Sequence, residues 1–364
     1  MKYKVCVVTV TYGDRFHLLK QVIDASFNEG VHKIIVVDNA SSENSRNQLK
    51  EYEKSLKDKL KVIYLDENTG SAGGYKRGLE EAYKCEDCEF IWLLDDDNKP
   101  LENSLKVLLD FWDSLDVENK EENAALFAFR PRKSAFIQIK KLITIENKTN
   151  LTHIRNSFLG FHIKELHKKV YRYLTRKIFK LEKPTPYNAY NQKRSQFGTI
   201  CDATYGGLLF HKSILKKIGY PNERFYVYVD DSEWSYRITK TGGKIYIVLD
   251  SEIEDLHLSS YENWDSKEPG SFLAKGDPFV VYYSVRNDVV YKLDNFVDNK
   301  IIYFINLFLY LTIITLINLP DMKNAKIILK AIRDGYKRRL GKVDFLNNRL
   351  DKSKRVEVLD GKIK

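Results

Sequence analysis

Residues 5–23 read VCVVTVTYGDRFHLLKQVI, and the periodicity of this stretch changes along its length. The run up to Thr11 is apolar and β-branched, which is typical of a buried strand. After a loop that contains a glycine, apolar residues recur at helical spacing from Leu18 to Ile23. The stretch therefore predicts a strand, a loop and a helix in that order.

The same alternation continues along the chain. KIIVVD at residues 33–38 and KVIYL at residues 61–65 read as strands, with helical patterns after each. Repeated strand–helix units predict an α/β fold with a Rossmann-like, doubly wound and mostly parallel sheet. Ligands bind such sheets beyond the carboxyl ends of the strands, where Thr11, Asp38 and Asn68 fall.

A further apolar run, FIWLL at residues 90–94, stops at three adjacent carboxylates, Asp95, Asp96 and Asp97. Such carboxylates repel one another, and a divalent cation neutralises them. Oxygen ligands of this kind suit Mg²⁺ or Mn²⁺. A solvated acidic turn that caps the next helix fits the same three residues. The sequence therefore leaves both a metal site and a capping turn open.

A second acidic cluster, Asp230, Asp231 and Glu233, follows an aromatic run and precedes Trp234. A carboxylate there can act as a general base, and the aromatic flank can dock a sugar. A helix start with acidic residues in its first turn fits the same residues.

Three other features suggest ligand contacts. His257 follows a strand-like run and can complete a metal site, although a single histidine is more often structural. The glycines of residues 67–78, ENTGSAGGYKRG, let a backbone approach a ligand closely. Arg286 in YYSVRN can face a phosphate or form a plain surface ion pair.

Positive charge is concentrated in two appendages. The chain carries a net charge of +10, yet residues 132–195 carry +13 and residues 321–364 carry +8, so the remainder is acidic. Basic clusters attract nucleic acid or anionic lipid. Because an acidic body repels a polyanion, we predict an anionic membrane surface and no nucleic acid as partner.

Residues 301–319 contain no charge and approach the length of a membrane-spanning helix. Spanning, interfacial and buried helices all fit this segment. The basic stretch at residues 323–342 has an apolar stripe of its own and favours surface attachment. Four cysteines and no N-terminal signal pattern predict a reduced protein at the cytoplasmic face of the cell membrane, peripheral or monotopic.

Six segments resemble, in order, the landmarks of family-2 glycosyltransferases with the GT-A fold. They are VTVTYGDR, VVDNASSEN, ENTGSAGGYKRG, LLDDDN, YVYVDDSEWSYR and DLHLSS. The resemblance covers about residues 4–130 and 198–290. Within the family, the glycine-rich string together with L-D-D-D is most similar to bacterial galactofuranosyltransferases, with rhamnosyltransferases as close relatives.

The resemblance implies a role for each matching residue. Thr11, Tyr12, Asp38 and Asn68 would line the nucleoside pocket, with Gly73 and Gly74 beside it. We also predict donor contacts for Asp96 and, from the YYSVRN segment itself, for Arg286. Asp95, Asp97 and His257 would hold Mn²⁺ or Mg²⁺. Asp231 matches the catalytic base of an inverting transfer, and Asp230 and Glu233 would support the acceptor or the base. Trp234, in the flank of this cluster, is also predicted to bind the acceptor.

The predicted organisation has four parts. They are a nucleotide-sugar-binding half (1–131), a basic amphipathic insertion (132–195), an acceptor half (196–295) and a helical, membrane-associating C-terminal region (296–364). The insertion matches no landmark of the family, and its role and the oligomeric state stay open.

We therefore predict a glycosyltransferase that moves galactofuranose from UDP-galactofuranose to a lipid-linked oligosaccharide or polysaccharide. A dTDP-rhamnose-dependent rhamnosyltransferase is the alternative. A non-catalytic carbohydrate-binding protein on the same fold would be expected to lack the carboxylates that this chain retains. A pyrophosphorylase would carry a glycine-rich loop after the first strand, where this chain has TYGDRFH.

Overall fold

The computed structural model describes residues 2–131, 134–144, 149–165, 196–257, 270–319 and 321–343. The described residues form one large sheet with the order β3-β2-β1-β4-β9-β6-β10-β8-β7, and β5 pairs with β10. The strands are β1 (Val5–Thr11), β2 (Lys33–Asn39), β3 (Leu60–Leu65), β4 (Phe90–Leu93), β5 (Asn98–Pro100), β6 (Ala124–Phe129), β7 (Asn150–Leu151), β8 (Phe197–Ile200), β9 (Leu208–His211) and β10 (Lys244–Asp255).

The N-terminal half of the sheet is parallel throughout. β1 pairs in parallel with β2 and β4, and β2 pairs in parallel with β3. β9 then runs antiparallel between β4 and β6, and β6 pairs in parallel with β10. The prediction of an α/β fold with a mostly parallel sheet is confirmed.

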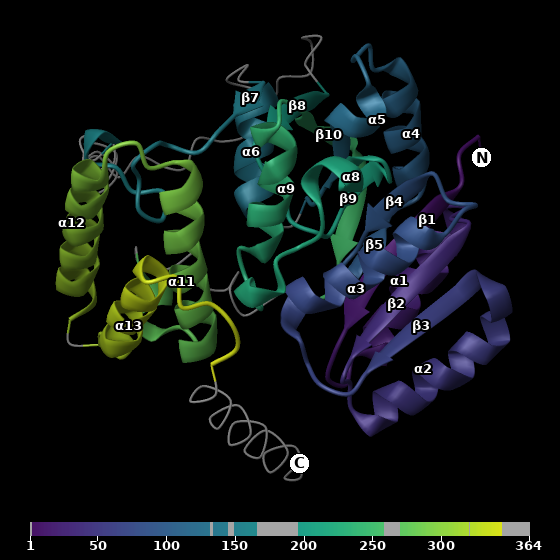
Figure 1. Cartoon of the computed structure of the whole chain (residues 1–364), viewed down its shortest axis with the longest axis horizontal. Helices are drawn as coiled ribbons and strands as arrows, with labels where there is room; N and C mark the ends of the chain where they lie inside the picture. The colour runs from purple at the N-terminus through teal and green to yellow at the C-terminus, as the bar shows by residue number, and fades with distance from the viewer. Residues whose placement is uncertain are drawn as a thin grey trace, which may run out of the picture.

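Helices cover both faces of the sheet and continue beyond it (Figure 1). They are α1 (Phe16–Asn28), α2 (Glu43–Leu56), α3 (Gly70–Lys84), α4 (Ser104–Ser114), α5 (Lys120–Asn123), α6 (Ser134–Thr144), α8 (Ile214–Ile218), α9 (Asp230–Lys240), α10 (Ser271–Lys275), α11 (Pro278–Asn295), α12 (Lys300–Asn318) and α13 (Ala325–Tyr336). Figure 1 shows α11, α12 and α13 grouped at one side of the sheet, away from β2 and β3.

Glycines let α3 pack unusually close to β1. A methyl group at Gly74 would lie 2.6 Å from Val10 Cγ1, and one at Gly78 would lie 2.4 Å from Val8 Cγ1. Distances this short are excluded by atomic contact, so only glycine fits at these two positions. The close approach fixes α3 against the centre of the sheet, where its N-terminal turn reaches the carboxyl ends of the strands.

The basic insertion is partly integrated into the sheet. Its first part forms α6, whose Phe136 stacks on Phe127 of β6 at 5.4 Å between ring centroids. Its next part supplies β7, which pairs with β8 at the sheet edge. The rest of the predicted amphipathic insertion, residues 166–195, lies outside the described residues.

Candidate active site

The first acidic cluster follows β4, and its middle carboxylate is held by the protein itself. Asp96 is buried. Arg15 Nη2 lies 2.7 Å from Asp96 Oδ1 and 2.8 Å from Asp97 Oδ2, and Thr11 Oγ1 donates to Asp96 Oδ2 at 2.7 Å. Burial raises the pKa of Asp96 to about 6, against the opposing charge of Arg15. Asp96 therefore serves to position Arg15 and Thr11 at the end of β1.

Asp95 and Asp97 form the part of this cluster that suits a cation. Asp95 is about one-third exposed, and its Oδ1 accepts a hydrogen bond from Tyr75 Oη at 2.8 Å. Burial, and then the charge of Asp95, raise the pKa of Asp97. Carboxylate oxygens at Asp95 and Asp97 are the hard ligands that suit a divalent cation, whose charge would offset the raised pKa of Asp97. A methyl group at Gly206 would lie 2.6 Å from Asp95 Oδ2, so glycine keeps this side of the site open.

His257 is exposed and lies at the end of a described segment. In the described part of the chain, the ligand atoms of Asp95, Asp97 and His257 do not all come within 4.8 Å of one another. Two of the three predicted ligands, Asp95 and Asp97, therefore lie in one cluster, and His257 stays a prediction.

A buried ion pair lies beside Asp95 of the first acidic cluster. Arg130, at the end of β6, pairs with Asp255 at the end of β10, and both are about 2% exposed. Asn98 Nδ2 donates to Asp255 Oδ1 at 2.9 Å, and Arg130 Nη1 lies 3.8 Å from Asp95 Oδ2. Sequence reasoning missed this pair, although each residue directly follows or ends an apolar strand.

The second acidic cluster begins α9. Ser71 Oγ donates to Asp230 Oδ2 at 2.7 Å, and burial raises the pKa of Asp230 to about 7. Burial and the charge of Asp230 raise the pKa of Asp231 well above the usual range of a carboxyl. Asp231 keeps partial access to solvent. A carboxylate with a raised pKa and an accessible edge suits a general base near neutral pH.

The two acidic clusters meet across α3. Ser71 and Tyr75 are one turn apart on this helix, and they bond to Asp230 and Asp95 respectively. The ring of Tyr75 stacks on Tyr205 at 3.9 Å between centroids. The charge of Asp95 also contributes to the raised pKa values of Asp230 and Asp231. Carboxylates from the two halves of the chain therefore share one site.

Two residues predicted to support the acceptor have structural partners instead. Trp234 is fully buried, and its indole N–H donates to the Gly219 carbonyl at 2.9 Å. The prediction that Trp234 contacts an acceptor is therefore wrong for this structure, because no part of the ring reaches the surface. Glu233 pairs with Arg237 through two hydrogen bonds of 2.9 and 2.6 Å.

Most residues predicted to line a nucleoside pocket are engaged within the protein. Asp38 is fully buried, and it accepts from Arg46 Nε at 2.5 Å and from the Ser41 amide at 2.8 Å. Asn68 Oδ1 accepts from the Gly70 amide at 2.8 Å. Tyr12 is different, because half of its side chain is exposed beside Arg15, whose guanidinium carbon is 5.3 Å from the ring centroid.

The structure explains Gly73 and Gly74 by helix packing, whereas the sequence suggested close approach to a ligand. A methyl group at Gly73 would lie 2.5 Å from Thr69 Oγ1, and Gly74 faces Val10. Both positions require glycine for packing of α3, so close approach to a ligand is not needed to explain them.

Arg286 does not face a donor phosphate in this structure. It lies on α11, is fully buried, and its Nη2 donates to the Phe225 carbonyl at 2.9 Å. The predicted contact with a phosphate is therefore replaced by contacts to the loop before α9.

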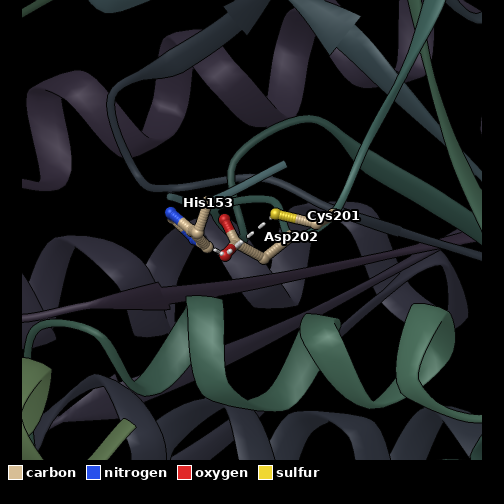
Figure 2. A group of neighbouring side chains, drawn as sticks. All are labelled: His153, Cys201 and Asp202. Atoms are coloured by element: carbon tan, nitrogen blue, oxygen red, sulfur yellow. Dashed lines mark hydrogen bonds and ion pairs between the residues drawn. The ribbon is translucent and has the colours of Figure 1, made fainter. Parts of the chain in front are cut away.

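A separate polar cluster beside α9 consists of His153, Cys201 and Asp202 (Figure 2). His153 Nε2 hydrogen-bonds to Asp202, and Tyr291 Oη donates to the same oxygen at 2.5 Å. Although burial opposes it, the bond to Asp202 raises the pKa of His153 to about 9. A protonated imidazole cannot bind a metal through this nitrogen, so we interpret the cluster as an ion pair between the insertion and the segment that follows β8.

Comparisons with known proteins identify the family of the chain. The model of the family described as "Glycosyl transferase family 2" matches residues 6–219. A curated relative, the putative teichuronic acid biosynthesis glycosyltransferase TuaG of Bacillus subtilis (strain 168), is 31% identical over 110 residues. The match covers 29% of this chain and 41% of TuaG, so the chain spans about two-fifths of that relative.

One solved structure supports the fold, and a second aligns with a lower TM-score. GalNAc-T7 with UDP, GalNAc and Mn²⁺ aligns with a TM-score of 0.53 at 13% identity, over 94% of this chain and 56% of that chain. The mannosyltransferase PcManGT from Pyrobaculum calidifontis with GDP-Man and Mn²⁺ aligns at 0.48 and 14% identity, over 92% and 87% of the chains. The family match spans more than half of the sequence, and the chain therefore belongs to glycosyl transferase family 2, with a GT-A glycosyltransferase fold.

Proposed function

We propose that the chain is an inverting, divalent-metal-dependent glycosyltransferase of cell-surface polysaccharide synthesis. It would move a sugar from a nucleotide-sugar donor to a lipid-linked glycan acceptor. The observation that carries the proposal is the meeting of two acidic clusters across α3, one suited to a cation and one suited to a base. The similarity to TuaG, described as a teichuronic acid biosynthesis glycosyltransferase, supports the polysaccharide assignment.

The proposed reaction is a single displacement at the anomeric carbon. Asp231 takes the proton of an acceptor hydroxyl, whose oxygen forms the new glycosidic bond while the bond to the donor phosphate breaks. The nucleoside diphosphate leaves with the electron pair, and the anomeric configuration inverts. A cation held by Asp95 and Asp97 would neutralise the charge that develops on the leaving diphosphate.

Ser71 and Tyr75 have supporting roles in this proposal. Ser71 fixes one oxygen of Asp230, and burial of Asp231 together with the charge of Asp230 raises the pKa of Asp231. Tyr75 orients Asp95 through its hydroxyl. Arg15 reduces the repulsion that would otherwise displace Asp97 from Asp95.

We propose UDP-galactofuranose as the donor, on the resemblance of the glycine-rich string and L-D-D-D to galactofuranosyltransferases. Titration calorimetry with UDP, dTDP and GDP, each with and without Mn²⁺, tests both the base and the metal. Mn²⁺-dependent binding of UDP supports the proposal, and preferential binding of dTDP would replace galactofuranose by rhamnose. Folded protein that binds none of the three contradicts a transferase and favours a non-catalytic protein.

We further propose attachment to the cytoplasmic face of a membrane through α12 and α13. α12 is long and apolar enough to cross a membrane by length and composition, and only 28% of its apolar window is buried. One face, including Tyr303 and Asn306, packs against the protein, whereas Ile301 and Phe308 are exposed. A helix covered along one side and apolar on the other suits the membrane interface.

α13 supplies the charge that complements this apolar face. α13 contacts α12 directly, because the ring centroids of Phe304 on α12 and Tyr336 on α13 lie 5.7 Å apart. α13 also exposes basic side chains to solvent, among them Lys326 and Arg333. Lysine and arginine beside an apolar surface favour anionic lipid.

A further inference from the structure

The loop before α9 has a backbone conformation that its residues disfavour. Tyr226, Tyr228 and Val229 have φ angles of 69°, 62° and 64°. This left-handed region favours glycine and is a clear outlier for a β-branched residue such as Val229. Such a conformation persists only where neighbouring contacts hold it, and it occurs most often at functional sites. Asp230 follows directly, so this loop sets the position of the first turn of α9.

Two adjacent side chains of α11 hold the loop through its carbonyl groups. Asn287 Nδ2 lies 2.9, 2.9 and 2.8 Å from the carbonyl oxygens of Phe225, Val227 and Tyr228. Arg286 Nη2 donates to the Phe225 carbonyl at 2.9 Å. The amide nitrogen of asparagine has two N–H groups, so three carbonyls share them. We call Arg286 and Asn287 the α11 clamp.

Arg286 also fixes the orientation of its neighbour. Its Nε donates to Asn287 Oδ1 at 2.9 Å, which leaves the amide nitrogen of Asn287 directed at the loop. Both side chains are fully buried, and the described residues place no carboxylate within salt-bridge distance of the guanidinium. The guanidinium carbon instead lies 4.6 Å from the ring centroid of Tyr283. Its Nη1 also donates to the Gly341 carbonyl at 2.6 Å, so the buried guanidinium is held by two backbone carbonyls and by Asn287.

The opposite side of the loop contacts the helix that joins the two acidic clusters. The Tyr226 carbonyl accepts a hydrogen bond from the Ala72 amide at 3.1 Å. Ala72 directly follows Ser71, which bonds to Asp230. The loop is therefore fixed between α11 on one side and the first turn of α3 on the other.

We propose that Arg286 and Asn287 are positioning residues for sugar transfer. They hold residues 225–229 in the left-handed conformation and so place the carboxylate of Asp231 against the Asp95 edge of the site. This inference rests on the proposed function, in which Asp231 is the base. It makes α11 part of the transferase unit, so the C-terminal helices contribute to the chemistry as well as to attachment.

The test compares Asn287→Ala with a matched control, Asn324→Ala. Asn324 is also buried in the C-terminal helices, and its Nδ2 donates to one backbone carbonyl, that of Gly276, at 2.8 Å. Turnover is measured with full-length protein as nucleoside diphosphate release from UDP-galactofuranose, or from dTDP-rhamnose if dTDP binds better. UDP or dTDP binding with Mn²⁺ and the pH profile of kcat are measured for each variant.

We expect Asn287→Ala to lower kcat about 100-fold while nucleotide affinity and donor KM stay unchanged, because a displaced base affects only the reacting state. The acidic limb of the pH profile should also move to lower pH, since a loosened loop admits water to Asp231 and lowers its pKa. Asn324→Ala should lose thermal stability without either change.

If Asn287→Ala leaves kcat and the pH profile unchanged while Asp231→Asn is inactive, the positioning role of Arg286 and Asn287 is wrong. The assignment of Asp231 as the base then still stands. Full turnover by Asp231→Asn would instead remove the base on which the inference rests. If Asn287→Ala does not fold, Arg286→Lys gives the same comparison, because lysine keeps the charge but lacks the planar fork that bonds both the loop and Asn287.

Discussion

Gly70 lies directly against the backbone of Tyr226, and a methyl group at residue 70 would stand 2.0 Å from the Tyr226 carbonyl oxygen. Gly70 also has a φ of 73°, which side chains disfavour. The start of α3 and the loop before α9 therefore fit together only if residue 70 is glycine.

Gly70→Ala should separate α3 from this loop and lower turnover by at least about 100-fold, because the base moves away from the Asp95 edge. Gly160→Ala is the matched control, since Gly160 has the same φ of 73° but no neighbouring atom within 4 Å of the added methyl. Gly160→Ala should lower the free energy of unfolding by only the roughly 1–2 kcal/mol that the left-handed backbone costs a residue with a side chain. Equal activity losses in the two variants, measured at matched folded fractions, would contradict the contact.

Asp231→Asn should bind Mn²⁺ and nucleoside diphosphate normally but transfer sugar about 10²–10⁴-fold more slowly. The amide is nearly isosteric but cannot accept the proton of the hydroxyl. Steady-state turnover and calorimetric nucleotide binding separate the two effects. A loss of nucleotide affinity equal to the loss of turnover would point to a binding role for Asp231.

Asp230→Asn should stabilise the protein above neutral pH. The pKa of Asp230 is raised to about 7, mainly by burial, so the folded state holds this proton more tightly than the unfolded state. Stability from this group is complete below its unfolded pKa of about 4 and is lost as pH rises through about 7. The variant cannot ionise, so its advantage should grow over that window and reach the order of a few kcal/mol at pH 8.

Thermal unfolding at pH 5 and pH 8 measures this difference. Asp113→Asn is a control of opposite sign, because hydrogen bonds from Tyr3 and Lys2 lower the pKa of Asp113. Its carboxylate contributes stability that is present at high pH and lost on acidification. An Asp230→Asn advantage that is larger at pH 5 than at pH 8 would show that its pKa is not raised.

Lys326→Glu should weaken binding to vesicles of anionic lipid by about tenfold or more, since each basic residue near such a surface contributes about 1 kcal/mol. Lys54→Glu on α2 makes the same change in net charge away from α12 and α13. Co-sedimentation at several vesicle concentrations compares them. Equal weakening would indicate a response to net charge alone, and no sedimentation of the full chain would remove membrane attachment.

Sequence periodicity was sufficient for the alternating sheet and for both acidic clusters, because these features are local. Asp95 and Asp231 each follow a recognisable run, and the family landmarks place them in order. Their partners are not local. Arg15 reaches Asp96 across 81 positions, and Arg130 reaches Asp255 across 125, so only the folded chain reveals them.

Side-chain direction accounts for the two errors among the predicted contacts. Trp234 and Arg286 lie in helices beside functional residues, and the sequence shows which turn they occupy but not which face is buried. Trp234 is turned toward Phe210 in the core, and Arg286 toward the loop before α9. Helical faces are determined by tertiary packing, which a single sequence specifies only indirectly.

Ser71 and Tyr75 lie one turn apart on α3, so this helix sets the distance between the two acidic clusters. An α-helix has a pitch of about 5.4 Å that its backbone hydrogen bonds maintain, so α3 fixes the spacing between the side chains that bond to Asp230 and to Asp95. A donor or acceptor of different size must then be accommodated elsewhere in the molecule. Efforts to redesign sugar preference should therefore leave residues 70–78 unaltered and vary the surrounding loops.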